Sequence, residues 1–411
     1  MDQAFGPFVL SRLIGRGGMA EVFLASRRDG DPSAAPLVLK RLRPEVAHDE
    51  EYTRRLRFEA TVASRLSHEN LVKLLEFGRV GDCHYLVMEQ VKGWSLKRLL
   101  DHALAQDTPP PLAVSVGIAR GILAGLRAMH DARDDAGARR PFLHRDITPG
   151  NVIIDHEGKA VLIDFGIAKD MFGPAITRIG RIVGTARYMA PEHRMGEFCD
   201  PRADVFSASL IFFELLAARN PWPSLSPTRE ILRTVFDPPE VNEVIAARIP
   251  EDLRAVVFRG MACKADDRYA DAHEMVAALE ATETFRALEQ PLGAAVSRWV
   301  AATGVVSDEA LEALIIDSLP SATQVEPVKK DLVWSPDGKL APLAEDISTD
   351  RLPVADILSI PPLPPARRKA EPTVDDLPLL KAPIPRGKKV AWAALAVACA
   401  ALLIVIVWVA K

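Results

Sequence analysis

The amino-terminal part of the chain alternates hydrophobic and polar residues in short runs, which is the pattern of half-buried β-strands. One stretch, Glu50–Leu66, instead repeats its hydrophobic residues at helical spacing. The runs with strand spacing are Phe8–Ile14, Glu21–Ser26, Pro36–Leu42, Leu71–Glu76 and His84–Glu89. The pattern therefore predicts a sheet of several strands accompanied by one main helix.

Beyond Gly93 the hydrophobic residues recur every three or four positions, so we expect a mainly helical region. The predicted helices are Leu112–His130, Asp204–Ala218, Thr228–Thr234, Pro250–Cys263 and Ala270–Glu283. The pattern stays helical over residues 282–319, where Ser307 is a candidate N-cap for a helix over Asp308–Ser318. We expect this extension to pack on the helical region; a separate regulatory module is the alternative.

Two changes in composition mark the carboxyl-terminal part of the chain. The 13 prolines and few aromatic residues of residues 320–389 predict a disordered linker. Residues 390–410 then form a run of 21 uncharged residues, which as a helix would span about 30 Å. Trp392 and Trp408 near its ends, and basic residues just before it, predict a transmembrane helix with the preceding chain in the cytoplasm. A buried helix of a soluble protein is the alternative, but such a helix normally carries a polar stripe.

Charge and cysteine content exclude several classes of protein. The net charge is -4 and no basic domain stands out, which argues against nucleic acid as a principal partner. The four cysteines are scattered without a CxxC pair, so we expect a reducing compartment and neither a disulfide framework nor a zinc site. The amino terminus leads directly into a strand pattern without a secretory signal. A charged stretch at residues 131–143 predicts a solvated loop.

Five short motifs follow one another in an order that suits phosphoryl transfer. They are IGRGGMAEVFLA (Ile14–Ala25), LVLK ending at Lys40, HRDITPGN (His144–Asn151), DFG (Asp164–Gly166) and GTARYMAPE (Gly184–Glu192). Glycines let the backbone approach phosphates, and a lysine with metal-binding oxygens neutralises their charge. With these motifs the chain resembles the eukaryotic-like (Hanks-type) Ser/Thr protein kinases of bacteria over roughly residues 8 to 280.

The resemblance implies an α+β bilobal kinase fold, with a small β-rich lobe that holds one main helix and a larger helical lobe. In these terms the domains are a kinase domain at 1–281 (N-lobe about 8–91, C-lobe about 92–281), a helical extension at 282–319, a linker at 320–389 and a transmembrane helix at 390–410. The membrane helix at the far end makes the expected protein tail-anchored.

The resemblance also assigns roles residue by residue. The catalytic group is Lys40, Asp146, Thr148 and Asn151, with Asp146 accepting the proton of the attacking hydroxyl. The positions matching the ATP site are Ile14, Gly15, Arg16, Gly17, Gly18, Val22, Val38, Lys40, Glu59, Met88, Glu89, Val91, Ile153 and Asp164. Glu59 would pair with Lys40, while Asn151 and Asp164 would bind Mg²⁺. Glu192, Asp204 and Arg268 match residues that support the large lobe.

Three positions depart from the family pattern. Thr148 stands where these kinases usually have a lysine that contacts the γ-phosphate, and a hydroxyl supplies no positive charge. Val38 replaces an alanine over the adenine, and Ala20 replaces the third glycine. These departures keep open an alternative, a pseudokinase-like membrane-tethered scaffold that binds nucleotide or partners. A kinase of small molecules is disfavoured, because GTARYMAPE resembles a platform that receives a peptide.

The segment between DFG and GTARYMAPE resembles an activation loop. Thr177 is the expected phosphate acceptor, since Thr185 belongs to the substrate platform. Arg145, beside the catalytic aspartate, would neutralise the added phosphate. The pairing of Pro149 with the GTARY sequence favours Ser/Thr over Tyr as the acceptor, by resemblance only.

These observations lead to one expectation of function. The chain should be a non-specific Ser/Thr protein kinase that transfers the γ-phosphate of Mg-ATP, with Mn²⁺ as a substitute, to protein hydroxyls and to its own activation loop. It should act in bacterial signalling at the cytoplasmic face of the inner membrane. The expected partners are protein substrates, ATP and the lipid bilayer, without nucleic acid; a homodimer stays open.

Overall fold

The computed structural model describes residues 3–30, 35–133, 137–164, 186–219, 221 and 248–308, with three short strands at 332–334, 340–342 and 349–352. The chain divides into two compact units, Met1–Pro362 and Leu363–Lys411, and the second lies outside the described residues. The predicted transmembrane helix at 390–410 and the predicted helix Thr228–Thr234 also lie outside them.

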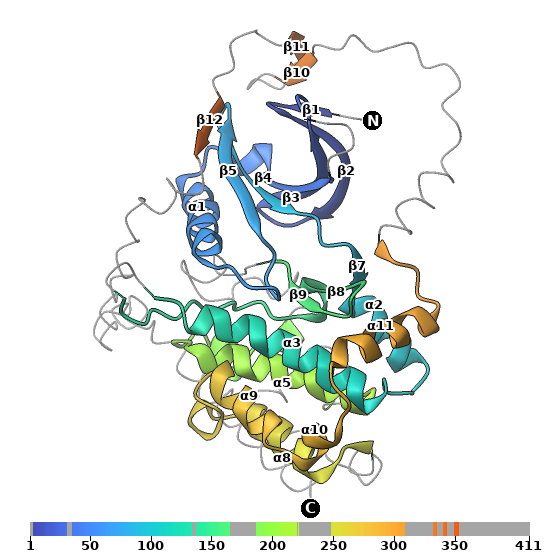
Figure 1. Cartoon of the computed structure of the whole chain (residues 1–411). Helices are drawn as coiled ribbons and strands as arrows, with labels where there is room; N and C mark the ends of the chain where they lie inside the picture. The colour runs from blue at the N-terminus through green and yellow to red at the C-terminus, as the bar shows by residue number, and fades with distance from the viewer. Residues whose placement is uncertain are drawn as a thin grey trace, which may run out of the picture. The chain divides into compact units, whose positions relative to one another are not determined.

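A seven-stranded antiparallel sheet forms most of the amino-terminal lobe (Figure 1). Across the sheet the strands are β1 (Gln3–Phe5), β2 (Phe8–Arg16), β3 (Ala20–Arg27), β4 (Leu37–Leu42), β6 (Cys83–Glu89), β5 (Leu74–Val80) and β12 (Thr349–Leu352). Successive side chains point to opposite faces, so Leu39 joins a small core with Phe8 and Tyr85, while Leu42 faces the core that the helices share. Lys40 lies on the same face of β4 as Leu42, which directs it toward the larger core.

The main helix of this lobe is α1 (Glu50–Arg65), and it confirms the prediction to within one residue. The Asp49 side chain caps its first turn by accepting a hydrogen bond from the Glu51 amide at 2.8 Å. The buried face includes Leu56, Ala60 and the ionisable side chain of Glu59. A short 3₁₀ turn, η1 (Pro44–Val46), connects β4 to this helix.

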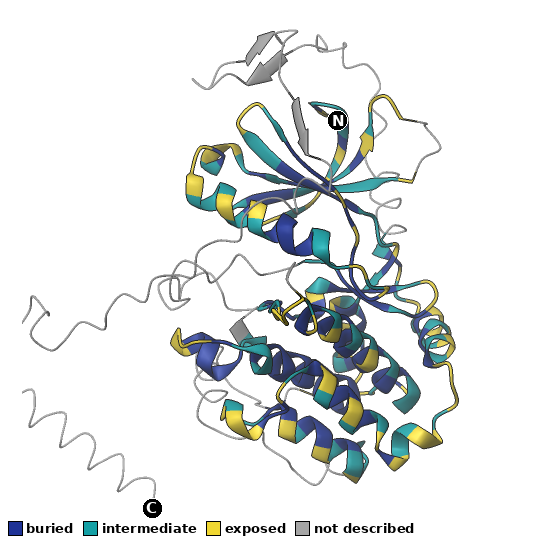
Figure 2. Ribbon diagram, turned by 60° about the vertical axis from the view of Figure 1, so that its left-hand side comes forward, coloured by how far each residue is buried: buried dark blue, intermediate teal, exposed yellow. Residues whose placement is uncertain are grey.

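The larger lobe is helical, as predicted, and its buried residues concentrate on the inward faces of the helices (Figure 2). The described helices are α2 (Leu96–Ala105), α3 (Leu112–His130), α4 (Pro191–Met195), α5 (Pro201–Ala217), α8 (Glu251–Gly260), α9 (Ala272–Glu280), α10 (Glu283–Ala287) and α11 (Leu292–Thr303). Helix α5 is buried from Ala203 to Ala217, which explains why it is apolar on all sides. The 3₁₀ turns η2 (Pro149–Asn151), η5 (Ala186–Tyr188) and η6 (Ala265–Asp267) complete the lobe.

Helix α3 is the one helix of the described residues that is long and apolar enough to cross a membrane. It packs against α5, α9 and α11, and 56% of its most hydrophobic window is buried. Its apolar composition is therefore accounted for by the core of the large lobe.

A small sheet of β7 (Gly93–Ser95), β8 (Val152–Asp155) and β9 (Ala160–Leu162) joins the two lobes to the active-site loops. Strand β7 pairs with β8, and β8 pairs with β9, both antiparallel. Leu71 forms a parallel bridge with Leu162, and the Val72 amide donates to the Leu162 carbonyl at 2.9 Å. The amino-terminal lobe is thereby bonded directly to the strand that ends just before Asp164.

Several predicted boundaries were wrong. The strand predicted over Leu71–Glu76 begins at Leu74 as β5, because Leu71 is used in the bridge to Leu162 instead. Helix α2 was not predicted at all. The helical extension is broken into α10 and α11, because Pro291 lies directly before α11 and Gly304 ends it in a left-handed conformation.

The linker prediction did not include the three short strands that the structure describes there. Strand β10 (Leu332–Trp334) pairs with β11 (Leu340–Pro342), and β12 pairs with β5 at the edge of the large sheet. Disorder of the remaining linker residues stays a prediction. Of the helix predicted over Asp308–Ser318, only its first residue is described, and it is helical.

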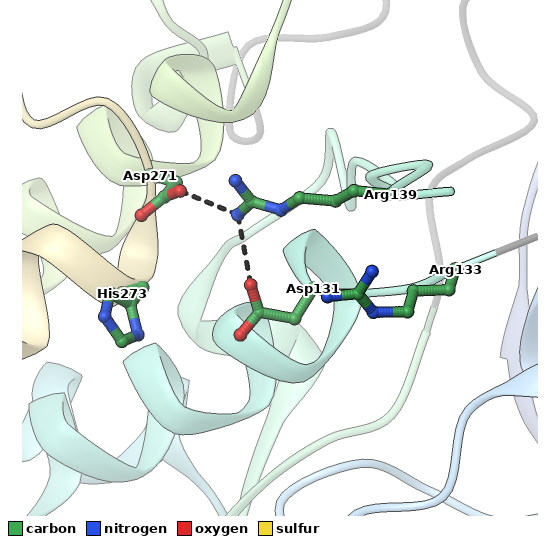
Figure 3. Close-up of a pocket in the computed structure, with 5 residues that line it drawn as sticks. All are labelled: Asp131, Arg133, Arg139, Asp271 and His273. Carbon is green, nitrogen blue, oxygen red and sulfur yellow. Dashed lines mark hydrogen bonds and ion pairs between the residues drawn. The ribbon is translucent and has the colours of Figure 1, made fainter. Parts of the chain in front are cut away.

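The charged loop before the catalytic motif is anchored, at least where it is described. Arg139 donates to Asp131 at 3.1 Å and to Asp271 at 2.7 Å, which ties the loop to the start of α9 (Figure 3). These three residues line a surface pocket with Arg133 and His273. The pocket contains none of the predicted catalytic or nucleotide-binding residues.

Candidate active site

Lys40 lies between two carboxylates. Its ammonium group donates to Glu59 Oε1 and to Asp164 Oδ1, each at 2.7 Å. The pair with Glu59 is buried, whereas the Asp164 side chain is 38% exposed. The structure thus brings together one residue from the sheet, one from α1 and one from the DFG motif, which the resemblance predicted to act jointly.

The ionisation of this group follows from burial and from charge. Burial would lower the pKa of Lys40, but the neighbouring Asp164 and Glu59 carboxylates outweigh it and hold that pKa above its ordinary value. Burial raises the pKa of Glu59 to about 7, and the Lys40 charge only partly opposes this. Glu59 Oε2 is buried with no hydrogen-bond partner among the described residues, which adds to the cost of its negative charge. Lys40 therefore stays charged, whereas the pKa of Glu59 lies close to neutral pH.

The catalytic loop holds Asp146 and Asn151 against each other. The Asn151 side-chain amide donates to the Asp146 carbonyl and to Asp146 Oδ2, both at 2.8 Å. Pro149 starts the 3₁₀ turn η2 that brings the asparagine back over the aspartate. The Ile163 amide donates to the Asn151 carbonyl at 3.1 Å, so the loop is also bonded to the residue before Asp164.

Asp204 supports the backbone of the catalytic loop from below. Its carboxylate accepts hydrogen bonds from the amides of His144 and Arg145, both at 2.8 Å. His130 Nδ1 accepts from the Ala272 amide, so Nε2 carries the proton and donates to Asp204 at 3.0 Å. Burial would raise the pKa of Asp204, but these hydrogen bonds and the nearby histidines lower it below its ordinary value.

The loop backbone is strained at one point. Arg145 has a φ of 62°, a left-handed conformation that is uncommon for a residue with a side chain. The amide of Arg145 itself and that of the preceding His144 donate to Asp204 and hold this position in place. The strain lies directly before Asp146, whose carboxylate would meet the acceptor hydroxyl.

The residues predicted for the nucleotide pocket occupy neighbouring strands. In the register of the sheet, Val22 lies opposite both Gly15 and Lys40, and Val38 lies opposite Met88. Met88 is buried and Val38 half-buried. Glu89 at the end of β6 is bonded to Lys73 through both its amide and its carboxylate. Ile14 and Arg16 on β2, Val91 after β6 and Ile153 on β8 complete the predicted set.

The glycine-rich turn leaves room for a ligand. A Cβ atom added at Gly18 would meet nothing within 4 Å, and one added at Gly15 or Gly17 would make only ordinary contacts. None of these three glycines has a positive φ. The chain itself therefore does not require glycine here, whereas the close approach of phosphates does.

Thr148 is half-buried and lies directly before η2. Its hydroxyl would be 3.7 Å from a Cβ at Gly150, so it lies over the turn that carries Asn151. Among the described residues, Lys40 supplies a cation that is bonded to Asp164. Thr148 supplies only a hydroxyl at the position where the family pattern usually has a second lysine.

The part of the GTARYMAPE segment that the structure describes is bonded to the core of the large lobe. Arg268 binds Glu192 through two parallel hydrogen bonds of 2.7 and 2.8 Å, and both residues are buried. The Tyr188 hydroxyl donates to Glu214 at 2.8 Å, and Ser207 donates to the Tyr188 carbonyl at 2.6 Å. Thr177, Thr185 and the rest of the activation loop lie outside the described residues.

Sequence reasoning missed several residues that support the site. Examples are His130, Glu214 and Asn70, whose side-chain amide donates to the Ala160 carbonyl at 2.8 Å while its own carbonyl accepts from Leu162. Each makes its contact across a separation of tens of residues. No local spacing signal identifies such contacts, so the sequence alone could not have revealed them.

Comparison with known proteins agrees with this geometry. A family model described as a protein kinase domain matches residues 8–277. The tyrosine-protein kinase MasK of Myxococcus xanthus is 33% identical over 281 residues, covering 68% of this chain and 43% of MasK. The serine/threonine-protein kinase PknD of Mycobacterium tuberculosis is 32% identical over 282 residues, covering 68% of this chain and 40% of PknD.

The chain spans only about two fifths of the length of these curated relatives. Among solved structures, the PknI kinase domain of Mycobacterium tuberculosis aligns with a TM-score of 0.49 at 26% identity, covering 68% of this chain and 96% of that one. The assignment rests on the family match and on the motifs rather than on this alignment. The chain belongs to the protein kinase domain family.

Proposed function

We propose that the chain is an ATP-dependent Ser/Thr protein kinase. The observation that carries the proposal is the joint placement of Lys40 with Asp164 and of Asn151 with Asp146 around one site. Residues that act only as surface charges would not be assembled from three separate segments, β4, the loop over 144–151 and the DFG motif. The relatives named Ser/Thr protein kinases support the same reaction.

In the proposed reaction the chain aligns the substrate hydroxyl oxygen and the bridging oxygen of ATP, and Asp146 accepts the proton of the hydroxyl. The hydroxyl of a substrate Ser or Thr transfers its proton to Asp146 as its oxygen forms a bond to the γ-phosphorus. The bond from that phosphorus to the bridging oxygen of ATP breaks, and ADP leaves. Lys40 neutralises the α- and β-phosphates, and Glu59 keeps the ammonium in place.

The residues present fit a divalent cation. Asn151 and Asp164 offer the oxygen ligands that Mg²⁺ prefers. The Ile163 amide donates to the Asn151 carbonyl, so Asn151 is bonded to the residue directly before Asp164. A bound Mg²⁺ would neutralise the charge that develops on the phosphates. Asp164 now bonds to Lys40, so it would exchange part of that contact for the metal.

The acceptor amino acid is a separate question, because one relative is named a tyrosine-protein kinase. The proposal favours Ser and Thr, since other relatives, PknD and PknH of Mycobacterium tuberculosis among them, are named Ser/Thr kinases. Analysis of phosphoamino acids in a transfer reaction separates the two. Phosphoserine or phosphothreonine supports the proposal, whereas phosphotyrosine alone would replace it.

The deciding experiment is transfer of labelled γ-phosphate from Mg-ATP by the full chain to a general protein acceptor, with Asp146→Asn and Thr148→Lys alongside. We expect transfer by the wild type and loss by Asp146→Asn. Thr148→Lys should raise turnover by about tenfold or more, because it adds a charge where phosphate charge develops. A silent wild type beside an active Thr148→Lys would establish the scaffold alternative instead.

The proposal extends to regulation and location. Autophosphorylation at Thr177, anchoring in the inner membrane through residues 390–410 and signalling at its cytoplasmic face follow from the sequence pattern. Mass spectrometry of the wild type after incubation with ATP should find phosphate on Thr177, and Asp146→Asn should not. Gel filtration of the same samples would test for a homodimer.

A further inference from the structure

The chain that follows the family match, which ends at residue 277, packs back along the larger lobe. Helix α11 packs on α3, where Leu292 and Val296 lie over Gly117. It also contacts the turn between β8 and β9, since Ser297 Oγ donates to the His156 carbonyl at 2.9 Å. A Cβ at Gly158 in that turn would lie 2.1 Å from the Gly293 carbonyl oxygen. Helix α11 is therefore seated tightly on the back of the hairpin that follows the catalytic loop.

After α11 a short segment, Val305–Asp308, continues to the start of α2, and we call it the strap. Gly304, with a φ of 69°, turns the chain out of the helix. The Trp94 indole donates to the Val305 carbonyl at 2.8 Å. Asp308 accepts from the Ser95 amide at 3.0 Å and from Arg98 at 2.6 Å.

Asp308 supplies what the start of α2 lacks. The N-cap residue of that helix, Ser95, makes no side-chain capping bond, and the first turn contains no acidic residue. A carboxylate beside a helix N-terminus offsets the positive end of the helix dipole and accepts from its free amides. The Asp308 and Arg98 side chains are about one third exposed, so the ion pair is partly shielded from solvent.

The residues held by the strap adjoin the nucleotide site. Trp94 and Ser95 belong to β7, which follows Glu89 and Val91, two residues predicted for the ATP site. In the register of the small sheet, Ser95 lies opposite Ile153, one of the residues predicted for the ATP site. Strand β8 in turn follows Asn151 directly. A shift of β7 would therefore move two sides of the nucleotide pocket together.

We propose that Asp308 is a positioning residue for nucleotide binding, which couples the C-terminal tail to the side of the ATP site that adjoins β7. When the strap is docked, β7 and the first turn of α2 are fixed, and the pocket is formed. When the tail is displaced, the strap leaves with it, and nucleotide affinity falls. The inference rests on the proposed function in that the ligand of the site is ATP.

The test uses the full chain and measures two quantities, the Kd of a fluorescent ADP analogue and the steady-state constants for ATP. Asp308→Ala and Asp308→Arg should weaken ADP binding and raise KM for ATP by about three- to tenfold. The kcat should change less than twofold, because Asp146, Asn151 and Lys40 are untouched. Asp101→Asn on the same helix, in an exposed pair with Lys97, is the matched control and should leave both constants unchanged.

Charge reversal separates positioning from a general loss of structure. Arg98→Asp should weaken binding as Asp308→Arg does, because it places two carboxylates together. The double variant Arg98→Asp/Asp308→Arg restores the ion pair and should recover at least half of the lost affinity on a logarithmic scale. Hydrogen exchange of residues 93–105 should rise in the single variants and return in the double one.

The outcomes are distinct. The positioning role of Asp308 would be overturned if Asp308→Ala and Asp308→Arg bound ADP within twofold of the wild type, or if the double variant recovered no affinity. If the charge-reversal variants do not fold, the Kd for the ADP analogue and the KM for ATP are measured on Asp308→Asn and Trp94→Phe instead. A wild type that binds ADP but transfers no phosphate contradicts the proposed function alone. A wild type that binds no ADP contradicts both.

Discussion

At the scale of single residues, the site depends on how one ammonium group is shared between two carboxylates. Lys40 bonds equally closely to Glu59 and Asp164, although the first is buried and the second is partly exposed. The motifs predicted all three residues as parts of the site, and they predicted that Glu59 pairs with Lys40. They could not predict the bond of Asp164 to Lys40, because that contact depends on the arrangement of the lobes rather than on spacing.

Breaking the buried pair should cost more stability than removing both partners. Lys40→Met leaves Glu59 buried without its cation, and we expect the free energy of unfolding to fall by about 3 kcal/mol. The double variant Lys40→Met/Glu59→Leu should recover most of that loss while remaining unable to transfer phosphate. Urea unfolding of both variants and the wild type measures the difference. Equal stability of the single and double variants would contradict the burial of Glu59.

The raised pKa of Glu59 makes stability depend on pH. Its pKa is about 7 in the folded chain and lies near 4.5 in the unfolded one, so the folded state binds a proton that the unfolded state releases. This contribution is fully present below pH 4.5 and is lost as the pH rises through 7, up to about 3 kcal/mol. We expect the melting temperature of the wild type to fall between pH 5 and pH 8 relative to that of Glu59→Gln. Asp101→Asn removes an exposed carboxylate, and its melting temperature should change with pH as that of the wild type does.

At the scale of elements, agreement with the sequence follows the clarity of the local signals. Helices α1 and α3 have regular apolar spacing, and α1 has an N-cap of its own, so they were predicted closely. Helix α2 buries Leu96, Leu99 and Leu100 at helical spacing but begins without a cap of its own. Its carboxylate comes from Asp308, 213 residues after Ser95. A start signal supplied from so far along the chain is invisible to any local pattern.

The docking of α11 on the β8–β9 turn can be tested with one pair of glycines. Gly158 and Gly137 both have a positive φ near 80°, but only a Cβ at Gly158 would meet backbone, at Gly293. Gly137→Ala should cost about 1 kcal/mol through backbone strain alone. Gly158→Ala should cost at least 1 kcal/mol more, because α11 must move away. Equal melting temperatures of the two variants would mean that α11 is not held against this turn in solution.

At the scale of the whole molecule, the kinase lobes and the segments after them differ in what the sequence could establish. The lobes repeat a family pattern over residues 8–277, so the motifs predicted their fold, while the roles of the site residues stay predictions. The extension was expected to pack on the large lobe, and α11 does so. Its return to Trp94 and Arg98 was not expected, because it depends on a partly exposed ion pair and one indole bond.

The membrane proposal belongs to this scale, because it concerns how the catalytic lobes meet their substrates. If residues 390–410 form a transmembrane helix, the full chain should float with liposomes in a density gradient and should resist extraction by high salt and alkali. Replacing Leu402 and Val405 with arginine should abolish flotation, since each charge at the centre of the bilayer is costly. The same variant should turn over ATP as fast as the wild type does, because the predicted catalytic residues lie before residue 165. Flotation that survives the arginines would contradict insertion, and attachment would then have to come from another part of the chain.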